Sequence, residues 1–79
     1  MTIAVNKNQI RFLLYLHKYN VSRAQPNTHV MSLSARGLVN IDCDTEQTTL
    51  TDIGKDFVEC DLVKRWTLDN DGNPVRTFQ

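Results

Sequence analysis

The sequence predicts a small α+β domain, because helical and strand-like patterns alternate within a chain of 79 residues. Apolar residues recur at three- and four-residue spacing in residues 8–17, 27–36 and 52–66, as they do in amphipathic helices. Between the second and third of these segments, β-branched residues flank a polar run, which is typical of a β-hairpin. A chain of this length builds one hydrophobic core and is marginally stable alone, so dimerisation is an open alternative.

The first helix is predicted to begin near Asn8, with Asn6 or Asn8 as its cap. Its apolar face is formed by residues at helical spacing: Ile10, Leu13, Leu14 and His17. Basic residues gather on one flank beside Tyr15: Lys7, Arg11 and Lys18. Such a stripe suits contacts with backbone phosphates, although a solvated charged face has the same pattern.

The second helix is expected over residues 27–36, after a short segment that ends at Pro26. In that segment Ser22 and Gln25 have capping-box spacing, which predicts a single helical turn. Val30 and Leu33 should point inward, whereas the outward face carries Thr28, Met31, Ser32 and Ala35, with His29 and Arg36 at one edge. Gly37 can take the left-handed conformation that ends a helix.

The hairpin is predicted from residues 38–43 and 48–51, with the polar residues 44–47 as its turn. Three acidic residues lie at this turn: Asp42, Asp44 and Glu46. Such a turn repels phosphates at short range. Either it stays away from nucleic acid, or it has a basic partner of its own.

The third helix is predicted over residues 52–66, with Thr51 as its cap. We expect Ile53, Phe57 and Cys60 on one side and Val58, Leu62, Val63 and Trp66 around the rest. This perimeter is wider than one small core requires, which favours a homodimer through the Ile53 to Trp66 helix. Burial of Trp66 under the C-terminal tail is the alternative. After this helix, Asp71-Gly72 is a strong hairpin-turn signal.

These elements resemble the winged-helix family of DNA-binding domains, in particular MarR-like repressors. In that family the recognition helix ends in a leucine, three polar or small residues and Gly-Leu-Val, and the wing leads into Leu-Thr-x-x-Gly. The matching residues, all within 28–58, are Leu33, Arg36, Gly37, Leu38, Val39, Leu50, Thr51 and Gly54. The resemblance implies a small winged helix-turn-helix-like domain over residues 1–66 with a two-stranded β-wing, followed by a C-terminal hairpin or tail over residues 67–79. Residues 20–25 depart from the family, because they leave room only for a shortened second helix.

Charge is divided unevenly although the net charge is zero. Residues 1–41 hold five basic and no acidic residues, whereas residues 42–79 hold four basic residues and all nine acidic ones. Such a split produces a dipolar molecule with one face that attracts phosphates.

Catalytic, metal and membrane patterns are weak in this chain. Cys43 and Cys60 lack companion ligands at metal-binding spacing and are interpreted as small buried thiols in a reducing compartment. No nucleophile has a recognisable base beside it, and there is no glycine-rich phosphate loop, so we expect neither an enzyme nor a bound cofactor. No apolar run approaches the ~20 residues of a membrane span, and no secretion signal is apparent, so a cytoplasmic protein is expected.

The resemblance and the charge asymmetry together predict a DNA-binding transcriptional regulator or DNA-associated accessory protein. The residues expected to contact DNA are Lys7, Arg11, Arg23, Gln25, Asn27, Thr28, Ser32 and Arg36. The alternative is a non-catalytic protein-binding module on the same fold, of the kind with which small viral or mobile-element proteins modify a host complex. The acidic wing and the apolar Met31 and Ala35 favour this alternative.

Overall fold

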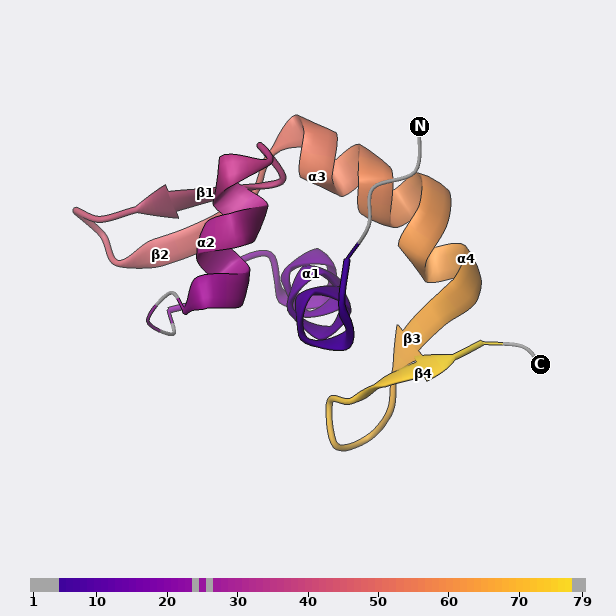
Figure 1. Ribbon diagram of the computed structural model, residues 1–79. Helices are drawn as coiled ribbons and strands as arrows, with labels where there is room; N and C mark the ends of the chain where they lie inside the picture. Colours follow the sequence, from indigo (N-terminus) through magenta and orange to yellow (C-terminus); the bar gives the residue numbers. More distant parts are fainter. Residues whose placement is uncertain (1–4, 24, 26, 78–79) are drawn as a thin grey trace.

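The computed structural model describes residues 5–23, 25 and 27–77. Its elements follow one another as α1 (Lys7–Tyr19), α2 (Thr28–Ala35), β1 (Val39–Asp42), β2 (Gln47–Leu50), α3 (Asp52–Phe57), the π-helical η1 (Val58–Leu62), α4 (Val63–Arg65), β3 (Trp66–Leu68) and β4 (Pro74–Arg76). Figure 1 shows α1 at the centre, with α2 and the β1–β2 hairpin on one side. On the other side α3, η1 and α4 arch across α1 towards the β3–β4 hairpin. The molecule is therefore a small α+β domain with two separate two-stranded antiparallel sheets.

Helix α1 forms the centre of the core. Asn6 caps it by accepting a hydrogen bond from the Gln9 backbone N–H, and the Gln9 side chain accepts one from the Asn6 backbone in return. This reciprocal capping box satisfies two donors that the first turn leaves unpaired. The buried side chains of the helix are Gln9, Ile10, Leu13, Leu14 and Leu16. His17, predicted on the apolar face, lies half-buried at its edge.

At Ser22, where a helical turn was expected to begin, the chain forms a β-bridge; Ala24, within the predicted turn, lies outside the described residues. The Ser22 backbone N–H donates to the Thr48 carbonyl at 2.9 Å, and the Thr48 N–H donates to the Ser22 carbonyl at 2.8 Å. Ser22 thereby forms an antiparallel bridge with β2. The prediction of a helical turn starting at Ser22 is wrong, because pairing with the edge of the hairpin satisfies its backbone groups instead.

The β1–β2 hairpin has the predicted polar turn, although its strands are shorter than expected. Val39 pairs with Leu50 and Asp42 with Gln47. At the turn, an Asp42 carboxylate oxygen accepts hydrogen bonds from the backbone of Asp44 and Thr45. The acidic residues are therefore partly explained by turn formation.

Helix α2 and helix α3 meet at the backbone of Leu38. Gly37, at φ +79°, ends α2, and the Leu38 N–H donates to the Leu33 carbonyl at 3.0 Å, as in a Schellman motif. The Leu38 carbonyl accepts from the Thr51 N–H at 3.1 Å, and the Thr51 hydroxyl donates to the Gly37 carbonyl at 2.5 Å. Gly54 packs directly against this backbone, where an added Cβ would clash with the Leu38 carbonyl group. We call Gly37, Leu38, Thr51 and Gly54 the Leu38 junction.

The third helical segment has a different inner face from the one expected. Val58 and Leu62 are fully buried and Gly54 faces Leu38, whereas Ile53 is 62% exposed and Cys60 is exposed. The prediction that Ile53 and Cys60 lie on a packed side is wrong. The buried positions follow a four-residue spacing from Gly54, because the absence of a side chain there lets this face approach the core.

The C-terminal hairpin begins at Trp66, which is one residue earlier than the predicted start of the C-terminal segment at residue 67. Helix α4 ends at Arg65, and Trp66 opens β3, where it pairs with Arg76. The Thr77 N–H and hydroxyl donate to the carbonyls of Arg65 and Lys64, so the hairpin also supplies partners for the end of α4. Trp66 and Leu68 pack partly buried against the core. In the described part of the chain, no helix has the length and apolar character needed to span a bilayer.

Candidate nucleic-acid interface

Two of the predicted contact residues, Arg11 and Arg23, meet at an open hollow beside α1. The hollow has a volume of about 470 Å³ and is lined by Arg11, Phe12, Tyr15, Ser22 and Arg23. We call it the basic hollow. Arg11 and Arg23 are both exposed, and neither forms a salt bridge with any residue that the structure describes. The hollow thus combines two cations with two aromatic rings.

A second, smaller hollow adjoins the first and reaches the start of α2. It is lined by Asn8, Arg11, Phe12, Asn27, His29 and Val30. Because Arg11 and Phe12 line both hollows, the two form one continuous surface between α1, the residue 22–23 segment and the start of α2. The structure therefore brings together Arg11, Arg23 and Asn27, which are distant in the sequence.

His29 fastens the start of α2 to the start of α1. Its Nδ1 lies 3.1 Å from the Asn6 amide nitrogen and its Nε2 lies 3.3 Å from the Asn8 amide nitrogen. The Gln9 side chain donates to the His29 carbonyl at 3.3 Å. These contacts hold the start of α2 beside the start of α1. His29, predicted as an edge residue, thus has a structural role in the surface.

Asn27 also has a structural role, as the cap of α2. Its side-chain oxygen accepts from the Val30 N–H at 3.0 Å, which is typical of an N-cap asparagine. Recognition of adenine by asparagine uses both the amide oxygen and the amide nitrogen. The cap engages the oxygen, so the amide nitrogen is the more available group for a ligand.

The remaining predicted contact residues are spread more widely. Lys7 and Thr28 are exposed at the first positions of α1 and α2, and Ser32 is half-buried on α2. Arg36 lies at the C-terminal cap of α2, at the opposite end from Asn27. Neither of the two hollows includes these four residues.

Gln25 lies on the side of the surface nearest the acidic hairpin turn. Together with Arg23 it lines a depression whose other walls include Asp42, Cys43 and Glu46. Arg23 is therefore shared between a basic region and an acidic one. Asp42 and Glu46 would repel a phosphate, so only the α1 side of Arg23 has a charge that suits an anion.

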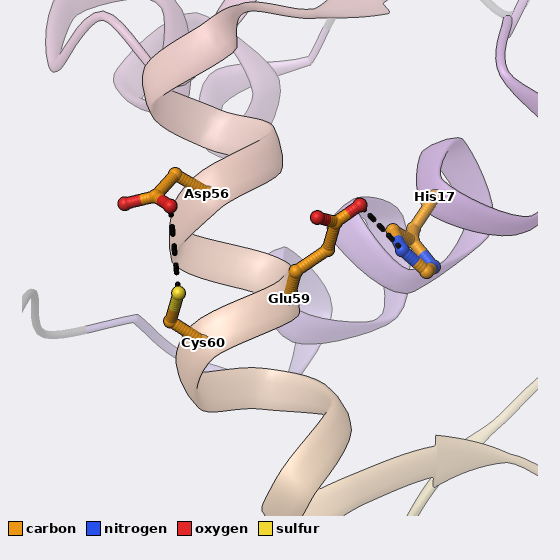
Figure 2. A network of polar contacts seen from close by, with 4 residues as sticks. All are labelled: His17, Asp56, Glu59 and Cys60. Carbon is orange, nitrogen blue, oxygen red and sulfur yellow. Dashed lines mark hydrogen bonds and ion pairs between the residues drawn. The ribbon is translucent and has the colours of Figure 1, made fainter.

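Two further polar contacts lie at the surface of α3 and η1, and Figure 2 shows them on different sides of this helical segment, with Glu59 towards His17 of α1 and Cys60 towards Asp56. We call these four residues the outer cluster. His17 Nε2 lies 3.5 Å from a Glu59 carboxylate oxygen, and the Cys60 thiol donates to Asp56 at 3.4 Å. The hydrogen bond to the Asp56 carboxylate and its negative charge raise the pKa of Cys60. A raised pKa disfavours the reactive thiolate, so this cysteine is a poor nucleophile at neutral pH. Cys43 and Cys60 are both exposed, so the prediction of two buried thiols is wrong.

No metal site accompanies these residues in the described part of the chain, where no three His, Cys, Asp or Glu side chains gather closely enough to hold an ion. The chemistry of the basic hollow and its neighbour is instead that of charge, hydrogen bonding and aromatic contact. Phe12 and Tyr15 line the basic hollow but were not among the predicted contact residues. The three- to four-residue spacing of Asn8, Arg11, Tyr15 and Tyr19 is the sequence signal that marks this face of α1.

Comparisons with protein-family models, with curated proteins and with solved structures found no match.

Proposed function

We propose that the protein is a DNA-associated regulator or accessory protein with a winged-helix-like fold that contacts DNA through its basic N-terminal half. The observation that carries the proposal is the meeting of Arg11, Arg23 and Asn27 on one continuous surface. No acidic residue occurs in residues 1–41, so no charge of that half opposes phosphate binding. Phosphate contacts by arginine supply much of the affinity of DNA-binding proteins.

The order of elements supports the winged-helix interpretation. Helix α1 is followed by the bridging residue Ser22, then by α2 in the position of a recognition helix, and then by the β1–β2 hairpin in the position of the wing. The described residues between α1 and α2 include no helix. The fold would therefore be a winged helix trimmed at its second helix, which leaves Phe12 at the surface of the basic hollow.

The test is fluorescence anisotropy with a labelled mixed-sequence DNA duplex, titrated at salt concentrations from about 50 to 200 mM. Binding through phosphates weakens steeply over this range. We expect Arg11→Gln and Arg23→Gln each to weaken binding and to reduce the slope of log affinity against log salt by about one. Neither change removes a buried contact, so both variants should fold.

Lys64→Gln is the matched control, because it makes the same change in net charge at an exposed position on α4, outside both hollows. Its duplex affinity should stay close to that of the unmodified protein. If Lys64→Gln lost as much affinity as the arginine variants, binding would depend on total charge and not on this surface. If the unmodified protein failed to bind at about 50 mM salt, the proposed function would be withdrawn.

A protein-binding module is the second candidate, and two observations favour it. Met31 is 61% exposed on the outward face of α2, where a base-reading side chain would be expected. The hairpin turn is acidic at Asp42, Asp44 and Glu46. We expect Met31→Lys to abolish binding to a protein partner and to preserve duplex binding. Loss of duplex binding with preserved binding to the protein partner would exclude the protein-binding module.

The third helical segment gives an argument for self-association, in which the partner is a second copy of the chain. Ile53 and Val63 are exposed apolar residues on this segment, and a second copy could cover them. Trp66, in contrast, is half-buried against the core and stacks with Arg76 at 5.2 Å. Light scattering at high concentration decides the matter, and a monomer mass would rule the homodimer out.

A further inference from the structure

We propose that the exposed face of α1 binds unpaired bases of single-stranded nucleic acid, with Tyr15 and Tyr19 as its stacking platform. This goes beyond duplex binding and rests on the proposed function in one respect, since both use the basic hollow. The face is defined by residues at helical spacing that are all exposed: Lys7, Arg11, Tyr15, Lys18 and Tyr19. We call it the tyrosine face.

The two tyrosines form one aromatic surface that the fold leaves uncovered. Tyr15 is 41% exposed and Tyr19 is 53% exposed. Their ring centroids lie 4.6 Å apart with a tilt of 43°, so each ring already contacts the other. Exposed apolar patches that are rimmed by polar residues mark interaction sites in many proteins. Every base has a π-face, so such a platform suits bases of any sequence.

Cations surround this aromatic surface on both sides. The Lys18 ammonium lies 5.3 Å from the centroid of the Tyr19 ring. On the other side, Tyr15 shares the basic hollow with Arg11 and Arg23. Proteins that bind single strands combine such aromatic platforms with a cationic groove that follows the phosphates. A base seated on Tyr15 would thus place its phosphates beside two arginines.

The path of the bound single-stranded nucleic acid over the surface follows from the charges around the basic hollow. On the side of Arg23 away from α1, Asp42 and Glu46 line the neighbouring depression and repel phosphates. The two remaining directions run along α1, either towards Lys18 and Tyr19 or towards Asn8 and Asn27. Both carry hydrogen-bonding or cationic groups and no acidic residue. The strand should therefore lie along α1 and not across the hairpin.

A paired base cannot use this platform, because its faces are occupied by its neighbours in the duplex. The basic hollow alone serves duplex and single strand equally, through phosphates. Tyrosine substitutions should therefore weaken single-strand binding selectively. This selectivity separates the inference from the proposed function.

The experiment compares fluorescein-labelled oligo(dT) and oligo(U) with a labelled blunt duplex, by anisotropy at fixed low salt. Tyr15→Leu and Tyr19→Leu should each weaken single-strand binding by about 5- to 150-fold, the range that loss of one base stack produces. Tyr15→Phe and Tyr19→Phe keep the ring and should retain the affinity. Ile53→Ala is the control, since it removes an exposed apolar side chain from another face. Duplex affinity should be unchanged in the Tyr19 and Ile53 variants, because neither residue lines the basic hollow or its neighbour.

A second measurement uses the unmodified protein, so it does not depend on the folding of a variant. Photocrosslinking with an oligonucleotide that contains 5-bromodeoxyuridine, followed by peptide mapping, should label the peptide with Tyr15 and Tyr19. Labelling elsewhere would overturn the inference. So would unchanged oligo(dT) affinity in the leucine variants, or equal loss in the leucine and phenylalanine variants.

The remaining outcomes distinguish the two proposals. Duplex binding without single-strand binding would overturn this inference and leave the proposed function. Single-strand binding without duplex binding would overturn the proposed function and leave this inference. Displacement of oligo(dT) by poly-glutamate as effectively as by unlabelled oligo(dT) would overturn the inference in favour of an acidic protein partner.

Discussion

The Leu38 junction and the outer cluster of α3 and η1 both consist of short polar contacts, yet they lie in different surroundings. At the junction, Thr51 contacts the backbone of Gly37 and Leu38, where Leu38 is fully buried. In the outer cluster, Glu59 and Cys60 are exposed to solvent. Water competes for the exposed contacts more strongly than for the part-buried contacts of the junction. The junction should therefore contribute most to stability, and the outer cluster should mainly affect local chemistry.

The largest effect is expected for Gly54→Ala. The added Cβ would meet the Leu38 carbonyl group, whose carbon lies 2.8 Å away, and neither backbone can move without breaking the junction. We expect a loss of about 3 kcal/mol or more in the free energy of unfolding, which is a large part of the stability of a domain of this size. Urea denaturation, monitored by circular dichroism, measures this loss in the free energy of unfolding.

Gly37→Ala is the matched comparison, because Gly37 has open space around its Cα and only its positive φ opposes a side chain. Its cost should be about 1–2 kcal/mol. A greater loss for Gly37→Ala than for Gly54→Ala would contradict the close approach at Leu38.

The next largest effect is expected for Thr51→Val. This change removes the hydroxyl that caps α3 through the Gly54 N–H and that donates to the Gly37 carbonyl. We expect a loss of about 1–2 kcal/mol, measured as a lower thermal midpoint. Thr51→Ser keeps the hydroxyl and should recover most of this loss. Equal midpoints for the valine and serine variants would show that the hydroxyl contacts contribute little.

The smallest effects on stability are expected in the outer cluster. Glu59→Gln should change the free energy of unfolding by no more than about 0.5 kcal/mol, since its contact with His17 is exposed. Asp56→Asn should instead change reactivity. It removes the carboxylate that raises the pKa of Cys60, so that pKa falls, more thiolate is present at pH 8.5, and alkylation by iodoacetamide accelerates. Peptide mapping separates Cys60 from Cys43, which serves as the internal reference.

Sequence reasoning located most elements, because their signals are local. Asn6 and Thr51 mark helix starts and Gly37 marks a helix end, through chemistry confined to a few residues, whereas the capping role of Asn27 was not predicted. The residues behind the winged-helix resemblance include Gly37, Leu38, Thr51 and Gly54, and all four lie at the Leu38 junction. They therefore contribute to packing, and they contain no information about a ligand.

The errors arose where distant residues decide the structure. Ser22 has capping-box spacing with Gln25, but pairing with Thr48 determines its conformation. In residues 52–66 apolar side chains occur on every side, so periodicity could not choose the inner face. The spacing of Gly54, Val58 and Leu62 was the available signal. Of the residues that line the basic hollow, Arg11 and Arg23 stand out in the sequence by charge and Tyr15 by helical spacing, whereas Phe12 gains its place only through the fold.

The bridge between Ser22 and Thr48 has a consequence for the order of assembly during folding. Helix α1 and the β1–β2 hairpin are held by hydrogen bonds between residues close in sequence, whereas the bridge joins residues far apart. Contacts between residues far apart in the sequence form only after the entropic cost of closing the loop between them has been overcome. They therefore form later than local contacts. Arg23 is next to Ser22, so the wall of the basic hollow that it supplies is completed once the hairpin exists to hold it. A nascent chain would acquire its helices first and the complete basic hollow last.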